Sequence, residues 1–182
     1  MGQAYTSGSR RAGLPRWPIG IALVLAVGLV VGVLIAAELV RRQSLGPLPL
    51  AVVAAPSAGS GDCARLLAAL PGQLDAGDLG TLERRQLAVP APAGATAWGE
   101  PPVVLRCGLS RPPGLTATSR LLAVSGVQFL EVPTPGASTW VAVDRPVYVV
   151  VALPPTSGSG PLQQVATVIG KALPQKDVDV PR

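Results

Sequence analysis

Five residues of this chain are candidates for holding a ligand: Arg84, Trp98, Glu100, Arg106 and Arg145. A guanidinium can bind a carboxylate or phosphate group through two parallel hydrogen bonds. Arg106 and Arg145 could therefore hold a small or wall-derived anion, with Trp98 as an apolar wall. We favour a structural interpretation, in which Glu100 forms an internal ion pair with Arg106 and Arg145 lies in a turn with solvated charges.

Catalytic chemistry is restricted because the chain contains no histidine. This excludes Ser-His-Asp and Cys-His catalysis and the common zinc enzymes. Neither lysine belongs to an S-x-x-K motif, and no phosphate-binding or dinucleotide-binding loop is present. We therefore expect no enzyme activity, no cofactor and no metal, and a carboxylate-dependent hydrolase is the less favoured alternative. Its acidic residues would come from Asp62, Asp75, Asp78, Glu83, Glu100, Glu131, Asp144, Asp177 and Asp179.

The chain has two cysteines, Cys63 and Cys107. In an oxidising compartment we expect them to form a disulfide bond. The chain-entropy model gives such a loop about 4 kcal/mol of stabilisation. Free thiols or a redox pair are the alternative, whereas two cysteines without histidine cannot build a usual structural zinc site.

A long apolar segment precedes these residues. Residues 19–40 contain one charged side chain, Glu38, and a helix of this length is about 33 Å long, enough to cross a bilayer. We therefore expect a transmembrane helix at 18–40, in contact with the lipid bilayer. Gly28 and Gly32 form a G-x-x-x-G pair that could admit a second helix, although we favour two lipid-facing glycines.

The arginines that flank this segment indicate its orientation. Three lie in residues 1–17 and two follow the segment directly, which predicts a cytoplasmic N-terminal arm and a single-pass protein of the plasma membrane. A cleaved signal peptide or a twin-arginine export signal is the alternative. Residues 43–182 carry ten basic and nine acidic side chains, so the basic excess belongs to the anchor and we expect no nucleic-acid partner.

The remaining chain is expected to form a Pro/Ala/Gly-rich tether at 41–61, an extracytoplasmic domain at 62–173 and a polar tail at 174–182. The apolar patch Leu48–Ala55 within the tether is too short to cross a bilayer, and it could lie along the membrane or pack on the domain. Asp62 is the candidate N-cap of the first helix. The fold class is α+β, with a mostly antiparallel sheet flanked by N- and C-terminal helices. Expected helices cover 62–70, 77–87 and 162–173, and expected strands cover 103–107, 121–132, 139–144 and 147–153.

The string AWGEPPVVLRCG at residues 97–108 resembles an actinobacterial membrane-anchored family, domain of unknown function 3515. The similarity extends over about residues 62–173, and Phe129 departs from it by standing where tryptophan is usual. The resemblance implies a cell-envelope protein and assigns no activity. By position, it suggests a shared site at Arg84, Trp98, Arg106 and Arg145.

We therefore predict a membrane-anchored cell-envelope protein that acts as a non-catalytic protein-interaction module, with an envelope protein as partner. The alternative is an extracytoplasmic binder of a small anionic ligand. Convergence of the arginines on one concave surface would favour the ligand binder, and their separation or internal pairing would favour the interaction module.

Overall fold

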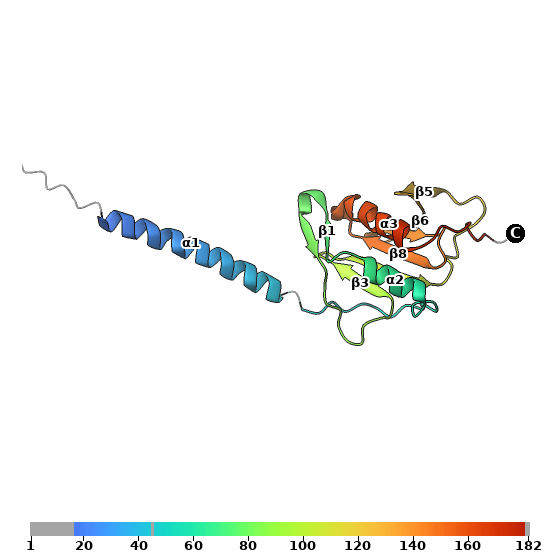
Figure 1. The fold of residues 1–182 in the computed structure, drawn as a ribbon, viewed down its shortest axis with the longest axis horizontal. Helices are drawn as coiled ribbons and strands as arrows, with labels where there is room; N and C mark the ends of the chain where they lie inside the picture. The colour runs from blue at the N-terminus through green and yellow to red at the C-terminus, as the bar shows by residue number, and fades with distance from the viewer. Residues whose placement is uncertain (1–16, 45, 181–182) are drawn as a thin grey trace, which may run out of the picture. The chain divides into compact units, whose positions relative to one another are not determined.

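The computed structural model describes residues 17–44 and 46–180, which form two units that divide after Gly46. The N-terminal unit contains a single long helix, and the C-terminal unit contains a six-stranded sheet, a two-stranded sheet and two helices (Figure 1). The α+β prediction is confirmed. In order, the elements are α1 (Trp17–Ser44), α2 (Gly61–Ala69), β1 (Gln73–Asp75), a 3-10 turn (Gly77–Leu79), β2 (Thr81–Glu83), β3 (Ala95–Trp98), β4 (Val103–Leu109), β5 (Leu121–Val124), β6 (Val127–Thr134), β7 (Ala137–Ala142), β8 (Tyr148–Leu153), a second 3-10 turn (Pro155–Ser157) and α3 (Gly160–Ala172).

The six-stranded sheet has the order β3-β4-β8-β7-β6-β5, and every neighbouring pair is antiparallel. After β4 the chain crosses to the far edge, where β5 begins. It then returns through three antiparallel connections, from β5 to β6, β7 and β8, until β8 lies beside β4. The most apolar strand is therefore in the interior of the sheet, where both of its edges are hydrogen-bonded.

Helices α2 and α3 cover one face of this sheet (Figure 1). The strands alternate between the two faces, so Val149 and Val151 of β8 point toward the helices together with Leu105 of β4. The apolar stripe of α3, which includes Val165 and Ile169, packs on them. The predicted disulfide between Cys63 and Cys107 joins α2 to β4 within this core.

The opposite face of the sheet carries a second, smaller apolar cluster. Its buried members include Leu130 and Val141, and Val178 and Val180 from the C-terminal tail pack against them. The tail is also fixed by a hydrogen bond from the Lys176 amide to the Asp144 carbonyl. The polar tail expected at 174–182 is therefore part of the domain as far as Val180, because its alternate valines cover apolar sheet surface.

Two local predictions on the N-terminal side of the domain were wrong. The expected helix at 77–87 is a hairpin of β1 and β2, in which Gly77 and Gly80 take the positive φ angles of the connecting turn. Strand β3 was not anticipated, since the preceding prolines obscured its short apolar run. The N-cap of helix α2 is Ser60 and not the predicted Asp62, which lies inside the helix. The Ser60 hydroxyl accepts a hydrogen bond from the Cys63 amide at 3.2 Å.

The segment expected to be an extended tether at 41–61 is attached to the folded unit at several points. Helix α1 continues to Ser44, and the amide of Leu48 already donates to the Gln86 carbonyl. The Ser57 amide then donates to the carbonyl of Gly108 on β4 at 3.0 Å. Gly108 has a φ of +83°, and a Cβ atom there would overlap the backbone of Ser57 and Ala58. Only glycine permits this close approach.

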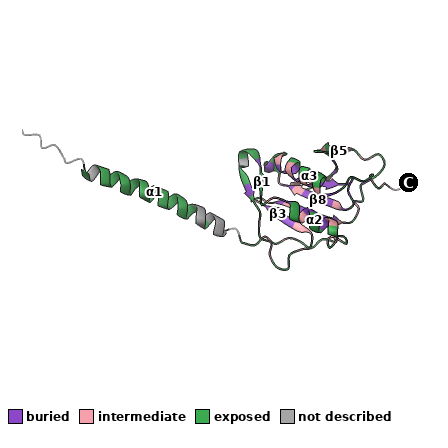
Figure 2. Cartoon of the chain, viewed as in Figure 1, coloured by how far each residue is buried: buried purple, intermediate pink, exposed green. Residues whose placement is uncertain are grey.

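Helix α1 is the single described helix that is long and apolar enough to cross a membrane. Its side chains are exposed wherever their burial is described (Figure 2). Length and composition thus agree with the transmembrane helix expected at 18–40. Except for Trp17, the predicted cytoplasmic arm at 1–17 lies outside the described residues.

Replacing both cysteines by alanine should destabilise the domain by about 2–4 kcal/mol, because the bond closes a long loop between α2 and β4. Urea unfolding of the full chain in mild detergent, followed by near-ultraviolet circular dichroism, measures this loss. A reductant should produce a similar loss in the parent protein and none in the double variant. Equal stability of the oxidised parent and the variant would contradict the prediction.

Gly108→Ala should cost at least about 2 kcal/mol, since alanine meets both an unfavourable φ and the backbone of the docked segment. Gly114→Ala is the matched control, because a Cβ atom at Gly114 meets no atom within 4 Å. The same unfolding measurement compares the two variants. Equal effects would show that the close approach of Ser57 to β4 contributes little to stability.

Candidate functional site

Arg84 and Trp98 form the first group of candidate residues. They face each other across an isolated β-bridge, and the guanidinium carbon of Arg84 lies 5.9 Å from the centre of the Trp98 ring. Arg84 also donates through Nε to the Thr96 hydroxyl at 2.9 Å. Trp98 is fully buried, with its indole N–H donating to the Pro71 carbonyl at 3.0 Å. Trp98 is therefore a core residue, and neither face of its ring is accessible to a ligand.

Glu100 has a different partner from the one expected. Its carboxylate lies 2.6 Å from Nη1 of Arg85, which also donates to the Gly99 carbonyl. The predicted ion pair between Glu100 and Arg106 was wrong. Glu100 lies in the turn between the antiparallel strands β3 and β4, so the two residues do not follow one extended stretch.

Arg106 lies on the face of the sheet opposite the helices, paired with Val150 across β4 and β8. Its Nη2 donates to the Ala51 carbonyl at 2.9 Å. Partial burial lowers the pKa of this guanidinium from its ordinary value. Arg106 thus fixes the segment that leads from α1 into the domain.

Asp144 and Arg145 form a buried ion pair, and the expected solvated turn was wrong. Their side chains are 1% and 3% exposed, with Arg145 Nη1 at 2.8 Å from Asp144 Oδ2. This contact lacks the alignment of a hydrogen bond, and Nη1 donates instead to the main-chain carbonyl of Asp144. Arg145 Nη2 donates to the Gly126 carbonyl at 2.9 Å, which ties the start of β8 to the β5–β6 turn.

The buried pair retains unused hydrogen-bonding capacity. Both carboxylate oxygens of Asp144 and Nε of Arg145 have no hydrogen-bond partner within the described protein. Arg145 also lines an open pocket of about 420 Å³ between the β5–β6 turn and the end of α3. Lys171 lies at this pocket as well, so its lining carries two cationic side chains.

The five predicted residues do not converge on one site. Arg106 is on one face of the sheet, whereas Arg145 contacts the Gly126 turn and approaches Gly170 of α3 on the other face. Arg84, Trp98 and Glu100 are grouped near β3, each with an internal partner. Arg85 was not among the predicted site residues, although the family resemblance covers the Arg84-Arg85 pair.

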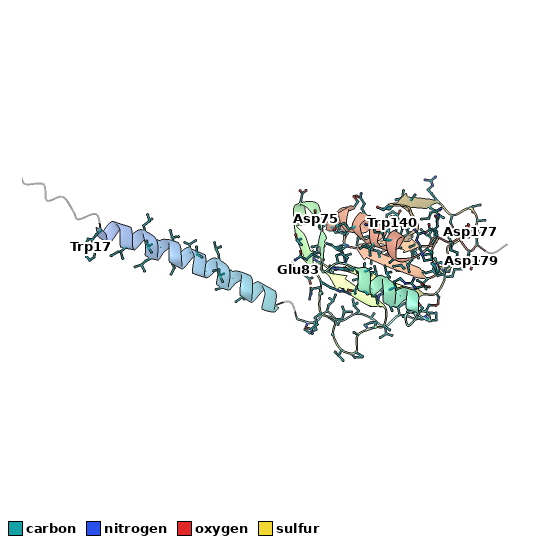
Figure 3. The ribbon with its side chains drawn as sticks, viewed as in Figure 1. Trp17, Asp75, Glu83, Trp140, Asp177 and Asp179 are labelled. Carbon is teal, nitrogen blue, oxygen red and sulfur yellow. A yellow bond between two sulfur atoms is a disulfide. The ribbon has the colours of Figure 1, made fainter. Side chains whose placement is uncertain are left out.

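The acidic residues are also dispersed. Asp75 and Glu83 lie on the β1–β2 hairpin, whereas Asp177 and Asp179 lie on the C-terminal tail at the other end of the domain (Figure 3). The described residues contain no group of three or more acidic or cysteine side chains that could hold a metal ion.

Asp144→Ala should destabilise the domain by about 3–5 kcal/mol, because it leaves the Arg145 charge buried without its counter-ion. The double variant Asp144→Ala/Arg145→Met should recover much of this loss, since it removes both charges. Urea unfolding of the full chain in detergent gives the three values.

Asp62→Ala provides the surface control for these variants. It removes an exposed pair in which Asp62 lies 3.0 Å from Arg65, and a change of less than about 1 kcal/mol is expected. If the double variant were as unstable as Asp144→Ala, the loss would come from packing and not from an unpaired charge.

Comparison with known proteins identifies the family of this chain. Neither a curated protein nor a solved structure matches the chain. A family model described as protein of unknown function (DUF3515) matches residues 23–178, which include most of α1 and nearly the whole folded unit. The chain therefore belongs to this family of unknown function.

Proposed function

We propose that this chain is a single-pass cell-envelope protein whose outer domain is a non-catalytic protein-interaction module. The observation that carries the proposal is the internal use of the candidate arginines. Arg106 holds the entry segment, Arg145 is buried beside Asp144, and Arg84 lies over the buried Trp98. Because these side chains are engaged in contacts within the domain, they are not available to form a ligand site. A partner would then bind the remaining exposed surface of the domain.

The membrane anchor and its orientation belong to the same proposal. Helix α1 has the length and hydropathy of a membrane span, and a disulfide bond is typical of an extracytoplasmic domain. We place the N-terminus in the cytoplasm and the domain outside, in the envelope of an actinobacterium, as the family resemblance implies. The family match to residues 23–178 includes the helix, which supports a role that needs anchor and domain together.

A small anion is the second candidate ligand, favoured by the pocket that Arg145 and Lys171 line. The exposed Lys171 ammonium and the buried Arg145 guanidinium could both attract a phosphate or carboxylate group. The nearby Asp144 carboxylate opposes such binding, because it already neutralises Arg145. For this reason we rank the interaction module first.

Crosslinking in intact cells, followed by purification through a C-terminal tag, tests the first candidate. We expect one reproducible partner, with capture lost or reduced several-fold in a variant of the exposed surface. Arg120→Ala tests the exposed position directly before the edge strand β5, and Leu122→Ser tests the strand itself, where Leu122 is half exposed.

Arg65→Ala is the matched control for Arg120→Ala, because it removes the same charge from an exposed position on α2. It should leave capture unchanged. If the parent protein is abundant and stable but captures no partner, the interaction module is contradicted. A rise in melting temperature with inorganic phosphate, lost in Lys171→Ala, would then favour the anion site.

A further inference from the structure

The folded unit has a charge-free apolar surface beside the point where the chain enters it. Residues 46–61 contain no charged side chain, and residues 86–94, which precede the buried strand β3, contain none either. Both lengths are unusual for exposed segments, since about a quarter of a typical surface is charged. The two segments belong to the same region of the domain.

Contacts at both ends hold these segments side by side. Leu48 forms a parallel bridge with Leu87, and the amide of Ala88 donates to the Leu48 carbonyl at 2.9 Å. At the other end, a Cβ atom on Gly94 would meet the Cβ of Ala58 at 3.0 Å. The two segments are thus joined at both ends, and together we call them the entry ribbon (residues 47–58 and 87–94).

Most of the exposed large hydrophobic side chains of the described folded unit lie on the entry ribbon. Val52 is 82% exposed, Val53 46% and Val89 93%, and the fourth such residue, Leu122, lies on the distant edge strand β5. A valine in water gains free energy when it enters an apolar environment. Clustered exposed valines therefore indicate a surface that is covered in the functional state.

The length of the connection indicates what covers them. The chain takes four residue-to-residue steps from Ser44, where α1 ends, to Leu48, where the domain begins its hydrogen bonding. Four steps span at most about 14 Å. The apolar part of α1 ends near Val40, and the last helical turn adds about 6 Å. Leu48 therefore lies within about 20 Å of the hydrocarbon boundary, and the headgroup layer occupies about 6 Å of that distance.

We propose that the entry ribbon docks on the lipid surface of the membrane, with Val52, Val53 and Val89 in the interfacial layer. This inference rests on the proposed membrane anchor. Because the ribbon has no charged side chain, its contact with lipid requires no charge to be desolvated, and its prolines and alanines add further apolar area. Arg106 fixes the backbone of the ribbon through the Ala51 carbonyl, so the valines are presented from a positioned segment.

Photocrosslinking of the full chain in vesicles of phosphatidylcholine and phosphatidylglycerol tests the proposal. A benzophenone amino acid replaces Val52 or Val89 in two separate proteins, and Leu122 in the control. Since Leu122 is also an exposed apolar residue, the three probes start from similar environments. After irradiation, lipid adducts at positions 52 and 89 should exceed those at 122 by at least about fivefold.

A probe at Leu29, within α1, separates this inference from the membrane anchor itself. Lipid adducts at Leu29 with equal, low yields at 52, 89 and 122 would overturn lipid docking and keep the anchor. Failure to label lipid at Leu29 would overturn the anchor and the docking together. Adducts at 52 and 89 to another protein chain in place of lipid would also overturn the proposal, because a protein would then cover the ribbon.

Discussion

The disulfide between Cys63 and Cys107 is the constraint on which most of the domain depends. It fixes α2 to β4, the strand that also binds the segment leading into the domain. The Arg106 guanidinium donates a hydrogen bond to the Ala51 carbonyl, and the Gly108 carbonyl accepts one from the Ser57 amide. Three consecutive residues of β4 thereby hold helix α2 and the segment that joins the domain to α1.

This arrangement gives a physical reason for the LRCG string at residues 105–108. Leu105 fills the core beneath the helices, Cys107 supplies the covalent link, and Gly108 leaves space for the backbone of the docked segment. Arg106 points to the other face and holds the same segment. The string is therefore explained by architecture, with no need to assign a ligand to it.

Asp144 and Arg145 have the corresponding role at the other end of the sheet. Their buried pair connects the start of β8 to the β5–β6 turn, and the Asp144 carbonyl also accepts from the C-terminal tail. A buried ion pair adds little net stability compared with apolar packing, but loss of one partner is costly. The pair thus specifies how the β5–β6 turn, strand β8 and the C-terminal tail are positioned relative to one another. Arg145 also lines the pocket to which Lys171 contributes.

The sequence alone determined the apolar helix, the α+β class and the cysteine pair, because these depend on local hydrophobic period and on residue type. It identified Trp98 and Arg145 as notable residues but misjudged Arg145, whose burial depends on a turn and a helix distant in the chain. The tertiary structure alone decided that Glu100 pairs with Arg85 and that residues 47–58 belong to the domain. Ion pairs, bridges and close backbone approaches between distant segments leave no periodic signal, so only the folded chain reveals them.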